Sequence, residues 1–235
     1  VPVASVGDLG TYGLFPDIED DDARNLALSA FSQMYGGLGK DTMTNFFSQT
    51  GRDAMKGADI LRRAPMMYRS SIEYSDNAIS QSMKSIAQVM FADLGTRVFH
   101  TLHGSYDTHS GEIASHQKLW TDLSTALSDF MDDLKEHGRD KDTIIFLFSE
   151  FGRRIKDNGA GTDHGSGGVA FVIGGDVKGG LYGRYPSLKD KDQVEGDLAF
   201  NNDFRRTYST ISDQWLGVDP ALVSNGNFDQ LDFLN

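Results

Sequence analysis

The chain has 235 residues, and 39% of them are hydrophobic, which is enough apolar material for one large or two small folded domains. Its formal net charge of −12 argues against a nucleic-acid surface, which needs clustered lysine and arginine. There is no cysteine, so a disulfide, a zinc–thiolate site and a cysteine nucleophile are excluded. No apolar run approaches the roughly 18 residues of a membrane span, so we expect no such span.

The N-terminal part of the chain is predicted to be mostly helical. Apolar residues recur at helical spacing over residues 23–35, 41–63 and 75–94. Pro65 is expected to end the second of these helices, and Gly95 the third. We interpret residues 1–95 as the helical portion of a single domain that spans residues 1–235.

Residues 96–235 are predicted to form an α/β portion. Two apolar segments, 97–103 and 143–149, flank a long amphipathic helix over residues 112–137. The second segment contains five consecutive apolar residues, which is typical of a strand buried on both faces of a parallel sheet. The connection is long enough for a right-handed crossover, so we expect these two strands to be parallel. The predicted fold class is α/β, a mainly parallel sheet flanked by helices.

A further strand is predicted at residues 169–173 and a closing helix at residues 203–216. Carboxylate and imidazole side chains gather where the three predicted strands begin or end. These candidate metal ligands are Asp107, His109, Glu150, Asp163 and His164. Imidazole and carboxylate are the usual ligands of zinc and manganese, and carboxylate-rich sites suit magnesium or calcium. The sequence therefore predicts a site for a divalent metal ion.

Two arginines, Arg153 and Arg154, follow Glu150 closely. A guanidinium pairs bidentately with the oxygens of a phosphate or sulfate group, which makes such an ester a reasonable substrate. We predict that Arg153 is the catalytic residue, as an anion contact or as a brace for Glu150. A structural salt bridge between Glu150 and Arg153 is the alternative. His103, His116 and Asp163 are candidates to support the ligands through hydrogen bonds.

Four segments resemble a known family in their order and spacing: GSYDTHSGEIASHQ, SEFGRRIKDN, GTDHGSGGVAFVIGG and NNDFRRTYSTISDQWLG. The family is the secreted bacterial group called domain of unknown function 1501. It belongs with the alkaline-phosphatase and sulfatase superfamily of metal-dependent esterases. The resemblance covers the chain from about residue 96 to the C-terminus.

The resemblance implies an alkaline-phosphatase-like core that is incomplete at its N-terminus. It implies metal-site roles for Asp107, His109, Glu150 and His164, with zinc, calcium, magnesium or manganese as the ion. It also implies a periplasmic or secreted location. The superfamily places a metal-binding Asp and its Ser or Thr nucleophile in an N-terminal portion that this chain does not show. We therefore expect the chain to be the C-terminal part of a longer protein, with the missing portion as its partner.

The function we expect is that of a metal-dependent hydrolase of phosphate or sulfate esters, with a small molecule or a polysaccharide as the substrate. The alternative is a non-catalytic secreted surface or assembly protein that retains the fold. The lack of a nucleophile in this chain favours the alternative, and the carboxylate and histidine clusters oppose it.

Overall fold

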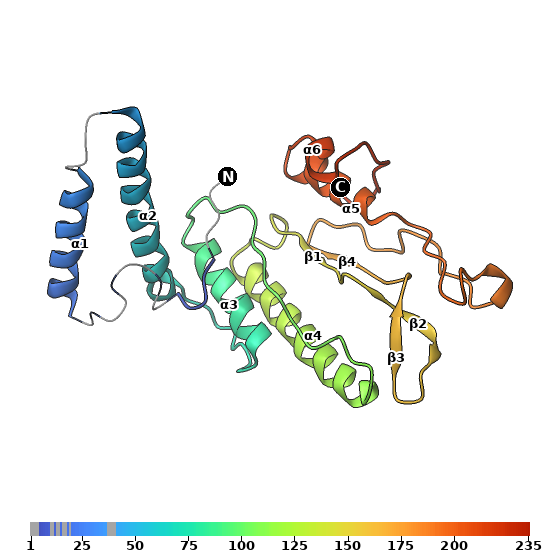
Figure 1. Ribbon diagram of the computed structural model, residues 1–235. Coiled ribbons are helices and arrows are strands. Elements are labelled where there is room, and N and C mark those ends of the chain that lie inside the picture. Colours follow the sequence, from blue (N-terminus) through green and yellow to red (C-terminus); the bar gives the residue numbers. More distant parts are fainter. Residues whose placement is uncertain (1–4, 10–11, 13–14, 16–17, 19, 37–40) are drawn as a thin grey trace. The chain divides into compact units, whose positions relative to one another are not determined.

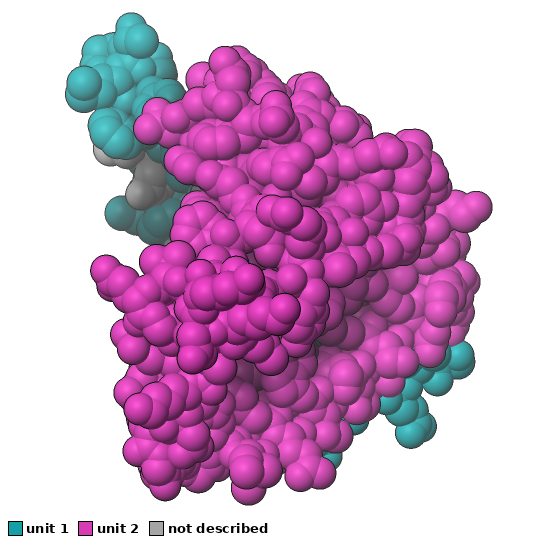
Figure 2. Space-filling model, turned by 90° about the vertical axis from the view of Figure 1, so that its right-hand side faces the viewer, with its two compact units in different colours: residues 1–102 teal, residues 103–235 magenta. Residues whose placement is uncertain are grey.

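The computed structural model describes most of the chain, namely residues 5–9, 12, 15, 18, 20–36 and 41–235. The chain divides into two compact units, residues 1–102 and 103–235, which are coloured separately in Figure 2. The boundary between the units lies at residues 102 and 103, whereas the sequence predicted that the helical portion ends at residue 95. That the two units together form a single domain stays a prediction.

Unit 1 is helical (Figure 1). Its helices are α1 (Asp21–Gly36), α2 (Thr42–Met67) and α3 (Ala78–Phe91). Side-chain caps explain where the last two begin. The carboxylate of Asp41 accepts a hydrogen bond from the backbone N–H of Thr44, and the side chain of Asn77 accepts one from the N–H of Ser80. The three helices predicted from apolar spacing are confirmed.

The second helix ends later than predicted. Pro65 lies inside the last turn of α2, which continues to Met67. Proline costs the helix one backbone donor, but the turn still closes because the N–H of Tyr68 donates to the oxygen of Ala64. None of the described helices combines the length and the apolar composition needed to cross a membrane.

Unit 2 contains the long helix α4 (Glu112–Glu136) and four short strands. The strands are β1 (Ile145–Leu147), β2 (Gly152–Asp157), β3 (Thr162–Gly165) and β4 (Phe171–Ile173). A 3-10 turn (Asp190–Asp192), α5 (Phe204–Thr210), a π-helical turn (Ile211–Trp215) and α6 (Pro220–Ser224) follow. The predicted helix at 112–137 is confirmed, and the predicted closing helix forms as α5 and the π-helical turn.

The strands form two small antiparallel pairs (Figure 1). β1 pairs with β4, with Phe146 opposite Val172. β2 and β3 form a hairpin in which Arg153 lies opposite His164. The buried apolar residues of unit 2 lie mainly on α4 and near the C-terminus: Leu123, Ala126, Phe130, Leu134, Phe233 and Leu234.

The structure replaces the predicted mainly parallel sheet by these antiparallel pairs. Residues 97–103, expected to be a strand parallel to β1, form no strand in the described structure, and Val98 and Leu102 are exposed. Between β1 and β4 the chain folds into the β2–β3 hairpin and contains no helix. A parallel pair needs a crossover connection, usually through a helix, so β4 returns antiparallel to β1 instead. The short apolar run specifies a strand here but not its partner.

Gly152 is required at the base of the hairpin because the backbone of a neighbouring segment approaches it closely. A Cβ atom at this position would lie 1.9 Å from the backbone oxygen of Gly167. We expect Gly152→Ala to lower the free energy of unfolding by about 3 kcal/mol, a cost typical of overpacking. Gly179→Ala is the matched control, because nothing lies within 4 Å of a Cβ there. Chemical denaturation of both variants measures the difference, and equal stability would contradict this account.

Candidate metal centre

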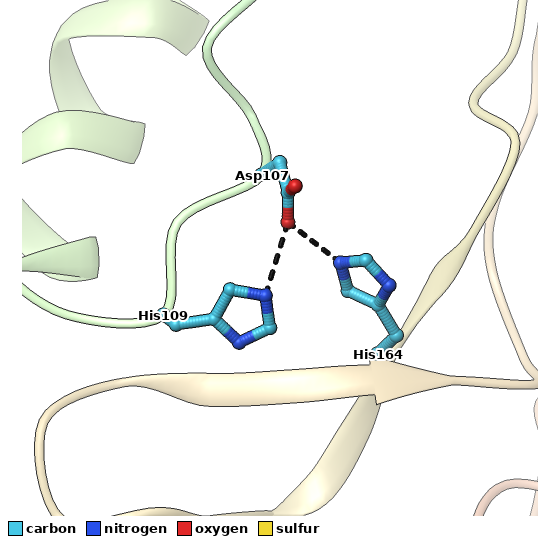
Figure 3. Close-up of side chains that lie close together, drawn as sticks. All are labelled: Asp107, His109 and His164. Atoms are coloured by element: carbon cyan, nitrogen blue, oxygen red, sulfur yellow. Dashed lines mark hydrogen bonds and ion pairs between the residues drawn. The ribbon is translucent and has the colours of Figure 1, made fainter.

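Three side chains of the predicted metal site lie together in unit 2: Asp107, His109 and His164 (Figure 3). Their ligand atoms are all within 4.8 Å of one another. Oδ1 of Asp107 lies 2.6 Å from Nε2 of His164 and 3.1 Å from Nε2 of His109. Two of the residues come from the loop before α4 and the third comes from β3, 57 residues later than Asp107. The chain therefore brings together ligand-type groups that are distant in sequence.

Asp163 orients one of these ligands. Its Oδ1 lies 3.1 Å from Nδ1 of His109, on the opposite side of the ring from Asp107. The side-chain amide of Asn158 donates to the same oxygen of Asp163, at 3.0 Å, and to the backbone oxygen of His109, at 3.2 Å. A carboxylate that accepts the Nδ1 proton leaves Nε2 as the ligand atom and fixes the orientation of the ring. The sequence proposed Asp163 both as a ligand and as a support, and the geometry fits the support.

The carboxyl groups of Asp107 and Asp163 are both stabilised in their ionised form. The hydrogen bond from His164 is the main cause that holds the pKa of Asp107 below its ordinary value. The hydrogen bonds from Asn158 and then from His109 lower the pKa of Asp163 in the same way. Asp107 is therefore available as an anionic ligand, and Asp163 as an anionic acceptor, over a wide pH range.

Arg153 fastens the ligand-bearing loop to the hairpin. Its Nη1 donates to the backbone oxygen of Thr108 at 2.7 Å and to that of Thr162 at 2.8 Å, and its Nη2 donates to the backbone oxygen of Tyr106. Asp107 lies between two of the residues that are held in this way. The sequence predicted an anion contact or a brace for Glu150, whereas these donors point at backbone carbonyls. Arg153 is thus a positioning residue in this structure.

Glu150 lies apart from the group of three ligands. Its recorded contact is a long hydrogen bond, 3.5 Å, from the hydroxyl of the neighbouring Ser149, and its side chain is exposed. The next residue, Phe151, stacks on the ring of His164 with a centroid distance of 4.0 Å. Successive side chains of an extended chain point in opposite directions. Because the side chain of Phe151 points towards His164, that of Glu150 points away from it. The structure does not bring this predicted ligand to the other three.

The loop is also supported by α4. Oε2 of Glu112 accepts hydrogen bonds from the backbone N–H and the hydroxyl of Thr162, at 2.7 and 2.8 Å. Nε2 of His116 lies 3.0 Å from Oγ1 of Thr108, and Nδ1 of His103 lies 3.0 Å from the hydroxyl of Tyr106. The two histidines predicted as supports therefore reach the loop and not the ligands themselves.

Sequence reasoning missed three residues that shape this site: Glu112, Phe151 and Asn158. Glu112 occupies the first turn of α4, and that position alone predicts only a favourable interaction with the helix dipole. Asn158 precedes Gly159, and an Asn-Gly pair is a strong signal for a hairpin turn that was available in the sequence. Phe151 gave no signal, because an aromatic residue after a strand is unremarkable without its partner.

The donor set fits a divalent transition metal. Two imidazole nitrogens and one carboxylate oxygen are typical of zinc, manganese and iron sites, whereas calcium and magnesium prefer oxygen ligands. All three side chains are exposed. Three protein ligands with an open side are the arrangement of catalytic zinc sites, while structural zinc sites are closed by a fourth protein ligand.

A family model described as "Protein of unknown function (DUF1501)" matches residues 23–216. The matched region extends from α1 to the π-helical turn and includes the three clustered ligands and Arg153. No match was found among curated proteins or among solved structures.

The three hydrogen bonds from Arg153 to backbone oxygens, which we call the Arg153 clamp, lead to a prediction about metal retention. We expect Arg153→Lys to lower metal affinity by about 10- to 100-fold, the usual range for residues that position ligands. Lysine keeps the charge, but its donors all lie on one nitrogen and lack the planar fork with which Arg153 reaches three carbonyls. Competition with a metal-binding dye measures the affinity. Arg184→Lys is the control because that side chain is exposed, and equal losses in both variants would refute the positioning role.

Proposed function

The chain belongs to the DUF1501 family, and from that premise we propose that it is a metal-dependent hydrolase of phosphate or sulfate esters. The observation that carries the proposal is the exposed group of Asp107, His109 and His164, whose ligand atoms lie within 4.8 Å of one another. The similarity of the motifs to the alkaline-phosphatase and sulfatase superfamily supports the choice of ester. An incomplete alkaline-phosphatase-like core and a periplasmic or secreted location belong to the same proposal.

Each residue of the site has a defined task in this proposal. Nε2 of His109, Nε2 of His164 and the carboxylate of Asp107 would hold the ion. Asp163 keeps the proton on Nδ1 of His109, and Arg153 keeps the loop in place. A bound divalent ion would polarise an ester oxygen and stabilise negative charge that develops on it. Because the ligands are exposed, the ester of a small molecule or of a polysaccharide can approach them from solvent.

A second candidate function is that of a non-catalytic surface or assembly protein that retains the fold. The position of Glu150 favours it, because a ligand expected from the superfamily lies outside the group. Metal binding without turnover would support this candidate. Turnover of an aryl phosphate or an aryl sulfate by the metal-loaded protein would support the hydrolase.

The metal site is tested by removing one ligand. We expect the wild-type protein to retain zinc or manganese through desalting, and His164→Ala to lose it, because two remaining ligands hold an ion too weakly. His100→Ala is the matched control, since His100 is exposed and lies outside the group. Elemental analysis gives the metal content, and circular dichroism checks that the variants are folded. Equal metal content in the wild type and His164→Ala would exclude the site.

Metal affinity should fall as the pH falls. The pKa values of Asp107 and Asp163 are lowered, chiefly by hydrogen bonds from His164 and Asn158 respectively, so these groups stay ionised in mild acid. An imidazole binds a metal ion only through an unprotonated nitrogen, so acid opposes ligation by histidine. The histidine ligands therefore decide how metal affinity changes with pH: affinity is lost on the acid side and recovered towards neutral pH. Titration calorimetry across this range measures it, and an affinity that is independent of pH would contradict ligation by histidine.

A further inference from the structure

A hollow lies directly beside the metal ligands in unit 2. It has a volume of about 380 Å³, and Arg154, His164, Ser166, Glu195 and Asp197 are among the residues that line it. This volume is within the range of sites that bind small molecules. Because His164 belongs both to the hollow and to the ligand group, a molecule in the hollow would lie next to the ion.

Arg154 brings an uncommitted guanidinium to this hollow. Its side chain is exposed, and its Nε makes a long hydrogen bond, 3.3 Å, to the backbone oxygen of His164. In the part of the chain that the structure describes, its two terminal nitrogens make no hydrogen bond or ion pair. The neighbouring Arg153 differs, because its terminal nitrogens donate to backbone carbonyls. Of these two arginines, Arg154 is therefore the one with a donor fork available for a ligand.

The other polar groups around the hollow are mostly committed. The buried carboxylate of Asp197 accepts hydrogen bonds from the backbone N–H groups of Ser166 and Leu198, each at 2.7 Å. The hydroxyl of Ser166 donates to the backbone oxygen of Leu198, also at 2.7 Å. These bonds build one wall of the hollow. Glu195 is exposed at the edge of the hollow, and among the described residues its carboxylate has no hydrogen bond or ion pair.

We propose that this hollow is the oxyanion subsite of the site described above, and that Arg154 binds the phosphate or sulfate group there. This inference rests on the proposed function and specifies which arginine recognises the ester. A guanidinium fork matches two oxygens of a tetrahedral oxyanion, and the place beside His164 brings those oxygens towards the ion. The carboxylates of Glu195 and Asp197 oppose an anion, so oxyanion binding depends on the charge of the metal as well as on Arg154.

The experiment uses inorganic phosphate and sulfate as probes, titrated calorimetrically into the full chain loaded with zinc. We expect Arg154→Gln to bind either probe at least about tenfold more weakly, which is the usual loss for a charge-assisted hydrogen bond. Lys156→Gln is the control, because it removes the same charge from an exposed position on the same strand. It should bind like the wild type. Glu195→Gln should bind roughly two- to fivefold more tightly, because it removes a repelling charge.

The outcomes separate this inference from the proposed function. Metal content, measured on the same samples, should be equal in the wild type and in Arg154→Gln. If the wild type retains zinc but binds neither probe, or if Arg154→Gln and Lys156→Gln behave alike, the subsite is refuted and the metal site stands. Weaker binding in Glu195→Gln would show that the hollow takes a cationic group and would also refute it. If the wild type retains no zinc, the proposed function fails, and the subsite fails with it.

Discussion

The guanidinium of Arg153 joins two parts of unit 2 that no strand pairing connects. It donates to the backbone oxygens of Tyr106 and Thr108 on the ligand-bearing loop and to that of Thr162 in β3. The loop has no regular secondary structure, so its carbonyls lack the partners that a sheet would supply. A rigid fork of charged donors satisfies several of them together. Because Asp107 lies between two of the carbonyls that are held, its position follows from this clamp.

Each carboxylate of the ligand group lies against an imidazole. His109 lies between Asp107 and Asp163, and His164 lies against Asp107 and is stacked on Phe151. An ion held by this group would bind to Nε2 atoms that carry no proton.

What the sequence could predict depended on how local the determining interactions are. The helices of unit 1 follow from apolar spacing and from caps such as Asp41 and Asn77, which act within one turn. The parallel sheet was not observed, because the apolar run around β1 carries no information about its partner. The β2–β3 hairpin was not predicted, because its strands are rich in charged residues and lack an apolar run. Three of the five predicted ligands converge, while Glu150 lies apart because Phe151 faces His164.

The two adjacent arginines show where sequence reasoning ends. Arg153 and Arg154 have the same chemistry and follow the same predicted strand, and the sequence-based prediction chose Arg153 as the anion contact. Alternation along β2 directs their side chains differently. Arg153 donates to backbone carbonyls, whereas the terminal nitrogens of Arg154 have no partner among the described residues and lie beside a hollow that includes His164. To bind an anion, the guanidinium of Arg153 would have to break its hydrogen bonds to the loop. Asp107 would then lose the contacts that hold it in position. Positioning and recognition therefore require separate residues, and this chain supplies them side by side.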